Sequence, residues 1–432
     1  MPTDKDYSYL ADKAYGVDSK RENENNRVPV VKGSILEVTN NDNKIVNSYE
    51  VLKVKDNTEN GMQAMAVAPL DKNGKADTSQ VVIAYAGTNF DDGLDVMTDA
   101  QTVVLNKDTL TTSTRVEVPF NPNKPSDRYV TTTTTVDAQS VTALQFANEI
   151  SKLYPNSRIT TTGHSLGEYL ALLVAAENQW VNVGFNGPDP YGVLSKEAKE
   201  WVKNNPGWLT NFRNRGDAIG NANGNGTGAE NKISFDMGLN PFKGAFHSLS
   251  TWEFDDEGRL LIPKNEYNKK ALQQEIERQL VQEFILKMAV LSDLKAKFQA
   301  SGGGLSTNEQ IYLDDTQALA VVQLASSEFE LAMTNTMKIY QDGILDLEDL
   351  WKTCVSKAQA ASPDLNYGEV MDTLSSANCT ESTMVTVPSE DFREKIAKAK
   401  QMSEKFTRLV SEIKSELAKL IEIDQELARQ LE

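Results

Sequence analysis

The spacing of apolar residues changes once along this chain of 432 residues, near Pro263. Before that point, short β-rich runs alternate with helix-like stretches. After it, apolar residues recur at steps of three and four over long distances, as they do in long helices. A chain of this length exceeds what one hydrophobic core usually supports. We therefore expect two domains, residues 1–262 and residues 263–432.

The first part has the pattern of an α/β layer fold. Helix-like stretches at 137–153 and 167–178 lie between apolar runs that are typical of strands. Strands that alternate with helices of this length favour a mostly parallel central sheet. The expected strands are 34–38, 45–54, 62–69, 81–86, 158–162 and 182–186.

Residues 111–135 break this alternation. Two threonine-rich extended runs, TTSTRVEV and YVTTTTTV, flank the turn-forming segment NPNKPSD. This pattern predicts a β-hairpin outside the central sheet. The hairpin is either an insertion without a direct role or a cover over an active site, since it lies between two core elements.

The second part predicts long helices separated by short breaks. We expect helices over 267–298 and 308–360, on either side of the glycine-rich break SGGG at 301–304. The second of these helices is expected to be interrupted or kinked near Asp342–Gly343, and residues 362–388 to be rich in loops.

The last helix, 392–431, has the clearest pattern in the chain. Its apolar residues recur at alternating steps of four and three, which is the heptad spacing of a packed helical seam. Ser403 and Asp424 are polar exceptions within the seam, and Ser389 is the expected N-cap. The sequence therefore predicts an all-α second domain that serves either partner binding or oligomerisation.

Charge and composition exclude several classes of protein. The chain has 44 basic and 62 acidic residues, and its net charge of −18 repels phosphate backbones, so we expect no nucleic-acid partner. No apolar run approaches the roughly 20 residues that cross a bilayer. We also expect no Sec signal peptide, because the first residues lack a basic region followed by an apolar one. Cys354 and Cys379 are interpreted as two separate thiols.

Ser165 lies in the segment GHSLG, residues 163–167, between a β-like run and a helix-like run. In a sharp strand-to-helix turn, the pattern G-x-S-x-G exposes the serine hydroxyl at the carboxyl end of the sheet. Gly163 and Gly167 then remove clashes with neighbouring elements. We identify Ser165 as a candidate nucleophile; the alternative is a serine that caps the following helix.

A serine hydroxyl needs a general base, and the chain contains two histidines. His164 adjoins Ser165, and consecutive side chains on a tight turn point apart, so its expected role is packing or holding the turn. His247 is therefore the candidate base.

The base in turn needs a carboxylate to orient it. The chain order serine, aspartate, histidine leaves Asp189, Asp217 and Asp236 between the other two residues. Asp217 follows a β-like run in TNFRNRGDAIG, which is a strand-end position, and it is the favoured candidate. Asp189, in the turn NGPDPYG, is the competitor.

Two backbone N–H groups are candidates for an oxyanion hole. Leu166 follows the nucleophile at a helix N-terminus, where N–H groups stabilise negative charge. Thr88 follows the buried-looking strand VVIAYAG and supplies the second donor, unless this is an ordinary strand-end turn. We interpret the acidic residues Asp91, Asp92 and Asp95 as a solvated turn rather than a calcium site.

At these residues the first part resembles the class 3 lipase family of α/β-hydrolases. The resemblance rests on AYAGTN with the following acidic turn and Asp99, on GHSLG, on RGDAIG and on a late histidine, and it covers about residues 5–260. It implies hydrolysis of acyl esters of glycerolipids without a cofactor, and a lid in the interval that 111–135 occupies. Glu168 departs from the family, in which a small residue commonly follows GHSLG.

Two other functions remain open. GHSLGEYLAL and GAFHS are similar to segments of acyl-CoA:carrier-protein acyltransferases, but an FPGQG-like opening is missing and no arginine follows Ser165 before Arg213. The other alternative is an inactive hydrolase domain in a protein whose function lies in its helices.

The layout of the two parts resembles type VII-secreted lipase toxins of Gram-positive bacteria with a C-terminal LXG-like helical targeting domain. This resemblance implies export without a Sec signal peptide, action on membrane lipids or phospholipids, small helical partner proteins on residues 263–432, and an immunity protein. The W-x-G turn of small type VII substrates is missing from the sequence.

Overall fold

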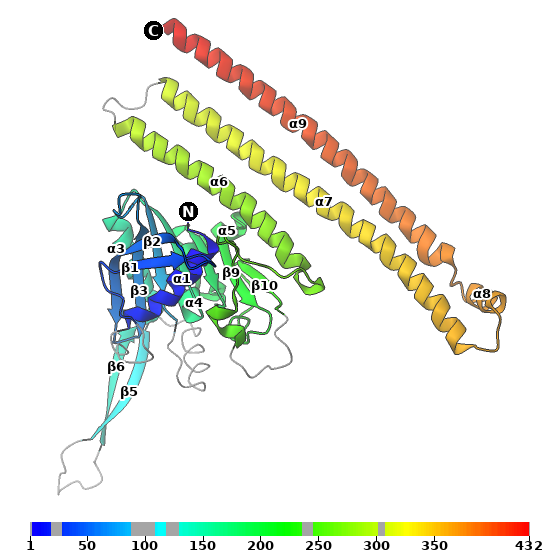
Figure 1. Cartoon of the computed structure of the whole chain (residues 1–432), viewed down its shortest axis with the longest axis horizontal. Helices are drawn as coiled ribbons and strands as arrows, with labels where there is room; N and C mark the ends of the chain where they lie inside the picture. Colours follow the sequence, from blue (N-terminus) through cyan, green and yellow to red (C-terminus); the bar gives the residue numbers. More distant parts are fainter. Residues whose placement is uncertain are drawn as a thin grey trace. The chain divides into compact units, whose positions relative to one another are not determined.

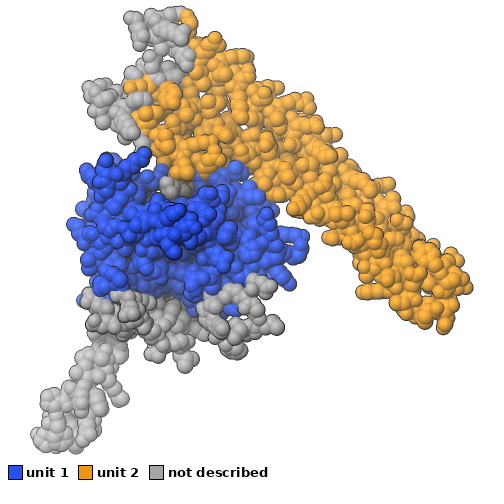
Figure 2. Space-filling view, in the orientation of Figure 1, with its two compact units in different colours: residues 1–282 blue, residues 283–432 orange. Residues whose placement is uncertain are grey.

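The computed structural model describes residues 2–18, 28–87, 109–117, 129–235, 245–300 and 307–431, with the backbone alone for 109–117 and 129–137. The chain divides into two compact units, Met1–Gln282 and Glu283–Glu432 (Figure 2). The first is an α/β unit and the second is helical wherever it is described in regular structure, which confirms the predicted fold classes of the two parts.

A mixed sheet of eight strands forms the centre of unit 1, in the order β1-β2-β3-β4-β7-β8-β9-β10 (Figure 1). The strands β4, β7, β8, β9 and β10 pair in parallel, as expected, whereas β1 to β4 pair antiparallel. Short turns join the first four strands, and such turns permit only antiparallel neighbours. The strand bounds are β1 Ile35–Thr39, β2 Ile45–Asn57, β3 Met62–Pro69, β4 Gln80–Tyr85, β7 Arg158–Gly163, β8 Val181–Phe185, β9 Leu209–Asn214 and β10 Glu230–Ile233.

Helices cover both faces of this sheet. Along β4, Ile83 and Tyr85 belong to a core shared with α3 (Gln139–Leu153) and α4 (Leu166–Asn178). The intervening Val82 and Ala84 belong to a second core, which contains residues of α1 (Asp4–Ala14). Strands buried on both faces read as continuous apolar runs, which explains why these strands are clear in the sequence. A further helix, α5 (Lys196–Asn204), packs against α4.

The threonine-rich segment forms the predicted hairpin. Strands β5 (Thr109–Glu117) and β6 (Tyr129–Asp137) pair antiparallel as a two-stranded sheet separate from the central one. Its proposed role as a cover stays a prediction.

Unit 1 extends into α6 (Lys269–Ala300), beyond the boundary predicted after Ile262. A buried ionic cluster contributes to this attachment: Arg278 Nη2 donates to Asp4 Oδ2 at 2.9 Å, and Arg278 Nε donates to Glu275 Oε2 at 2.8 Å. These contacts fix the first turns of α6 to the start of α1.

Unit 2 consists of the remainder of α6, α7 (Thr307–Ala361), α8 (Tyr367–Ser376), a π-helical turn (Ser382–Thr386) and α9 (Val387–Leu431). The interruption considered near Asp342–Gly343 does not occur, because α7 continues through both residues, and the alternative of a kink there stays a prediction. A Cβ at Gly343 would lie 2.9 Å from the Phe392 ring, so the glycine permits close packing of α9.

The expected N-cap Ser389 is also wrong. The π-helical turn leads directly into α9, so Ser389 is a buried residue within the helix. The hydroxyl of Thr380 accepts instead from the N–H of Thr383 at 3.1 Å, one turn before α9. The segment predicted to be rich in loops contains α8 as well.

Helices α7 and α9 pack side by side in unit 2 (Figure 1). The rings of Phe329 and Phe406 stack with their centroids 4.0 Å apart. The predicted seam is buried at Ala399 and Val410, but Ile413 is 38% exposed and Leu420 is 52% exposed. Among the seam residues whose side chains are described, the buried ones therefore end at Val410. Both cysteines, Cys354 and Cys379, are free thiols, as expected.

Candidate active site

Ser165 occupies a strained turn between β7 and α4. Its φ of 59° and ψ of −129° are unfavourable for a residue with a side chain, and such strain is characteristic of functional turns. A Cβ at Gly163 would lie 2.3 Å from the carbonyl carbon of Gly167, and one at Gly167 would lie 2.2 Å from the Tyr85 oxygen. The turn therefore requires both glycines, as the sequence predicts.

The structure brings Ser165, His247 and Asp217 into one hydrogen-bonded chain. His247 Nε2 lies 2.9 Å from Ser165 Oγ, and His247 Nδ1 lies 2.9 Å from Asp217 Oδ2. The side chain of Asp217 is buried, and that of His247 is 16% exposed. A proton can pass from the hydroxyl to the imidazole, whose other nitrogen is fixed by the carboxylate.

Backbone donors orient the Asp217 carboxylate. Its Oδ1 accepts from Ile219 N at 3.0 Å, and its Oδ2 accepts from Gly220 N at 3.1 Å. Asp217 follows β9, in the strand-end position that the sequence predicts.

The competitor Asp189 has a different role. Its carboxylate accepts from Tyr191 N, Thr227 N and Thr227 Oγ1, at 2.8, 3.0 and 2.6 Å. Asp189 thus connects two loops and is not the partner of His247 in this structure. Asp236 lies outside the described residues.

The predicted oxyanion hole is described in part. Leu166 is the first residue of α4, and an N–H in the first turn of a helix has no partner within the helix. Thr88 lies outside the described residues, as do Asp91, Asp92, Asp95 and Asp99. A Cβ at Gly87 would lie 3.2 Å from the Ser165 Cβ, so the chain that follows β4 passes directly beside the nucleophile.

The second histidine is buried behind the first. His164 Nδ1 lies 2.8 Å from the Tyr15 hydroxyl, and His164 Nε2 lies 2.6 Å from the carbonyl oxygen of His247. Burial, and to a smaller extent the nearby His247, lower the pKa of His164 to about 3, against the raising effect of the backbone hydrogen bond. His164 is therefore neutral at neutral pH and does not contact Ser165 Oγ as a base.

Two further residues of this site, Tyr15 and Asn186, are not predicted by any sequence pattern described above. Asn186 follows β8 with a φ of 54°, and its Nδ2 donates to the carbonyl of His247 at 3.1 Å. The segment FNGP offered one signal, because asparagine tolerates left-handed backbone at a strand end. Tyr15, just beyond α1, belongs to no recognisable motif.

Glu168 is a fully buried acid one turn beyond the nucleophile. Its Oε1 accepts from Asn182 Nδ2 at 2.7 Å, whereas its Oε2 has no hydrogen-bond partner. Burial raises the pKa of Glu168 well above its ordinary value, against the opposing effects of Asn182 and Arg213. A Cβ at Gly184 would overlap this carboxyl group, so the glycine provides the space for it.

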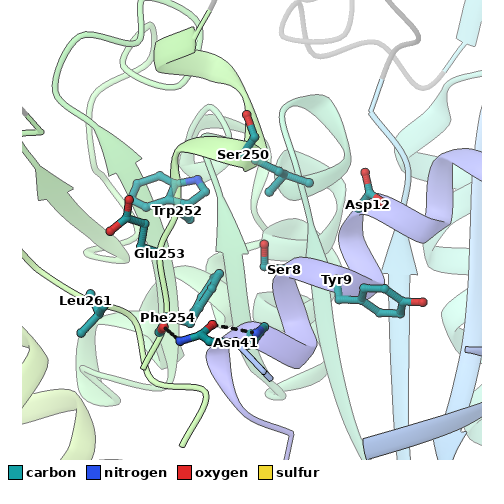
Figure 3. A pocket seen from close by; sticks show the side chains of 11 residues that line it. Ser8, Tyr9, Asp12, Asn41, Ser250, Trp252, Glu253, Phe254 and Leu261 are labelled. Carbon is teal, nitrogen blue, oxygen red and sulfur yellow. Dashed lines mark hydrogen bonds between the residues drawn. The ribbon is translucent and has the colours of Figure 1, made fainter. Parts of the chain in front are cut away.

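Two hollows lie on unit 1 away from the nucleophile. One, of about 600 Å³, lies between α1 and the chain that follows His247; Ser8 and Asp12 line one side, and Ser250, Trp252 and Glu253 line the other (Figure 3). The other, of about 350 Å³, includes Tyr169 and Asp189. Among the described residues that line them, neither hollow includes Ser165, Asp217 or His247.

Within the described part of the chain, no group of three or more histidine, cysteine or acidic residues is arranged to hold a metal ion. Of the helices described, none combines the length and the apolar character needed to cross a membrane. The chain matches no protein-family model and no curated protein sequence.

Proposed function

We propose that unit 1 is a serine hydrolase of the α/β-hydrolase type that cleaves acyl esters of membrane lipids. The observation that supports this most strongly is the hydrogen-bonded chain from Ser165 through His247 to Asp217, with both distances at 2.9 Å. The strained turn between β7 and α4 supports it independently.

In the proposed acylation step, Ser165 Oγ attacks the ester carbonyl carbon while its proton passes to His247 Nε2. Asp217 stabilises the imidazolium, and the N–H of Leu166, with that of Thr88, binds the oxyanion. The intermediate collapses, the bond to the alcohol oxygen breaks, and His247 gives its proton to that oxygen.

In deacylation, a water molecule loses a proton to His247 and adds to the acyl carbon. The bond to Ser165 Oγ then breaks, and the serine recovers its proton from His247. The products are an alcohol and a fatty acid, and every proton transfer uses residues of this chain. The choice of glycerolipid esters rests on the resemblance to class 3 lipases.

The test combines a serine-directed probe with product analysis. A fluorophosphonate should label Ser165, and Ser165→Ala should lose both labelling and ester hydrolysis, by about 10⁴-fold or more in kcat. Products are then analysed with phospholipid, triglyceride and acyl-CoA. Equal turnover by wild type and Ser165→Ala would contradict the proposal. Preference for a carrier thiol over water would indicate acyl transfer, and no labelling would indicate an inactive hydrolase domain.

For unit 2 we propose binding of small helical partners, in a protein exported by a type VII-like route with an immunity protein in the producing cell. The support within the unit is the apolar surface of its helices: Ile339 on α7 is 67% exposed, and Ile413 and Leu420 of the α9 seam are 38% and 52% exposed. Co-expression with small helical proteins encoded nearby, followed by size-exclusion chromatography, tests this. Recovery of the full chain as a stable monomer would count against it.

A further inference from the structure

His164 is fully engaged in hydrogen bonds although the proposed reaction does not use it. Its ring lies 4.8 Å, centroid to centroid, from the ring of His247. One ring nitrogen meets the Tyr15 hydroxyl, and the other meets the backbone carbonyl of His247. The ring thus connects the end of α1 to the backbone of the proposed general base.

These partners fix the tautomer of His164. A carbonyl oxygen only accepts, so Nε2 must carry the proton and donate to His247 over 2.6 Å. Nδ1 is then the acceptor, and the Tyr15 hydroxyl donates to it over 2.8 Å. Loss of the tyrosine hydroxyl would leave the buried Nδ1 without its donor, and the His164 ring that donates to His247 would be held at one nitrogen instead of two.

The approach of Tyr15 depends on the chain that follows β4. A Cβ at Gly87 would lie 2.5 Å from the Tyr15 hydroxyl oxygen and 2.7 Å from the His164 carbonyl oxygen. Gly87 therefore leaves the space in which the tyrosine reaches the imidazole.

The carbonyl of His247 receives two donors from different strands. His164, after β7, donates through Nε2, and Asn186, after β8, donates through Nδ2 at 3.1 Å. Asn186 Nδ2 also lies 3.3 Å from the Phe246 carbonyl oxygen. These hydrogen bonds hold the backbone of His247, so the position of its Nε2 depends on only two side-chain torsion angles.

We propose that Tyr15 and His164 are positioning residues for His247: the hydroxyl of Tyr15 holds the His164 ring, which donates to the His247 carbonyl, and this aligns the His247 ring between Ser165 and Asp217. The inference rests on the proposed function and extends it to α1. Neither residue touches the reacting atoms.

Tyr15→Phe is the first variant, because it removes one oxygen and preserves the packing of the ring. We expect kcat for ester hydrolysis and the rate of fluorophosphonate labelling to fall about five- to tenfold, with KM unchanged. Tyr9→Phe, within α1, is the matched control and should retain the wild-type rate. A Tyr15→Phe enzyme with wild-type kcat would overturn the proposal.

His164→Gln and His164→Leu separate the hydrogen bond from packing. The glutamine amide provides an N–H for the His247 carbonyl and should retain kcat within about fivefold of wild type, whereas leucine should lose about 10- to 100-fold. Equal losses in the two variants, at equal thermal stability, would contradict a role through the donated hydrogen bond.

Nuclear magnetic resonance of the ¹⁵N-histidine-labelled full chain gives a readout independent of activity, since the chain has only two histidines. His164 should show a protonated Nε2, an unprotonated Nδ1 and no titration between pH 5 and 9. Tyr15→Phe should shift the His164 Nδ1 resonance and the Nδ1–H resonance of His247. If wild type and Ser165→Ala hydrolysed esters equally, the proposed function would fail, and these resonances would still test the positioning role. An unchanged His247 signal in Tyr15→Phe, or a His164 that titrates near pH 6.5, would overturn the positioning role.

Discussion

At the residue scale, the two histidines show how environment divides the roles of one side-chain type. His164 is buried, with both ring nitrogens committed to neighbours, and it stays neutral. His247 keeps one edge accessible and links a hydroxyl to a carboxylate. Adjacency to the nucleophile in the sequence therefore does not identify the base; the direction of the side chain on the turn does.

Substitution of Asp217 tests which acid orients the base. Asp217→Asn should lower kcat about 10³- to 10⁴-fold, because the amide N–H facing His247 Nδ1 favours the wrong tautomer. Asp189→Asn should change kcat less than tenfold and lower the melting temperature, since Asp189 accepts three donors that connect two loops. The measurements are steady-state ester hydrolysis and thermal unfolding of both variants. The reverse pattern would assign the role to Asp189.

Glu168 should make the stability of the protein depend on pH. Its pKa is raised in the folded chain, so its contribution to the free energy of unfolding is complete below the unfolded pKa of about 4.3 and is lost as pH rises toward the folded pKa. Glu168→Gln removes this loss, and its amide can occupy the place of the partnerless Oε2. We expect the variant to be more stable than wild type by about 1–3 kcal/mol at pH 8, and by less at pH 5.

Urea unfolding at several pH values measures this difference. The exposed Glu197→Gln on α5 serves as the control and should show no such trend. A Glu168→Gln variant less stable than wild type at pH 8 would mean that the carboxyl group is charged in the folded protein.

The sequence was sufficient to predict Ser165, His247 and Asp217 as neighbours, because a motif, a small number of histidines and the chain order reduced the choices. It was insufficient for Tyr15 and Asn186. Their contacts join segments that are far apart in the chain, and no local pattern indicates that α1 ends beside the turn after β7.

At the element scale, periodicity predicted the strands that are buried on two faces and missed the antiparallel pairing of β1 to β3. The interruption considered in α7 shows the converse error. Glycine is a weak helix former, but at Gly343 the close packing of Phe392 outweighs its local preference.

The contact between α7 and α9 can be tested at its stacked rings. Phe406→Ala removes the partner of Phe329 and should destabilise the helical transition of the full chain by about 1–3 kcal/mol, as the site is partly buried. Circular dichroism during urea unfolding measures the effect. Leu409→Ala, at an exposed position of the same helix, should change the transition by less than about 0.5 kcal/mol. Equal effects of the two substitutions would show that the stacked rings do not stabilise the pair.

At the scale of the whole molecule, unit 1 ends beyond the change in periodicity, in a part of α6 that the ionic cluster attaches to α1. A chain of residues 1–282 should fold cooperatively, whereas a chain of residues 1–262 should be less soluble and should melt at least 5 °C lower. The shorter chain leaves Asp4 without Arg278, and it loses Ala271 from the core. Scanning calorimetry of both chains compares them. Equal melting temperatures would place the boundary where the sequence pattern changes.

The pairing of Asp4 with Arg278 also constrains the order of events during synthesis. The two residues are 274 positions apart, so the carboxylate of Asp4 leaves the ribosome long before the guanidinium that neutralises it. During synthesis, the first helix therefore carries Asp4 without its partner Arg278 while the strands are being made. Completion of unit 1 is thereby postponed until nearly its entire length has emerged.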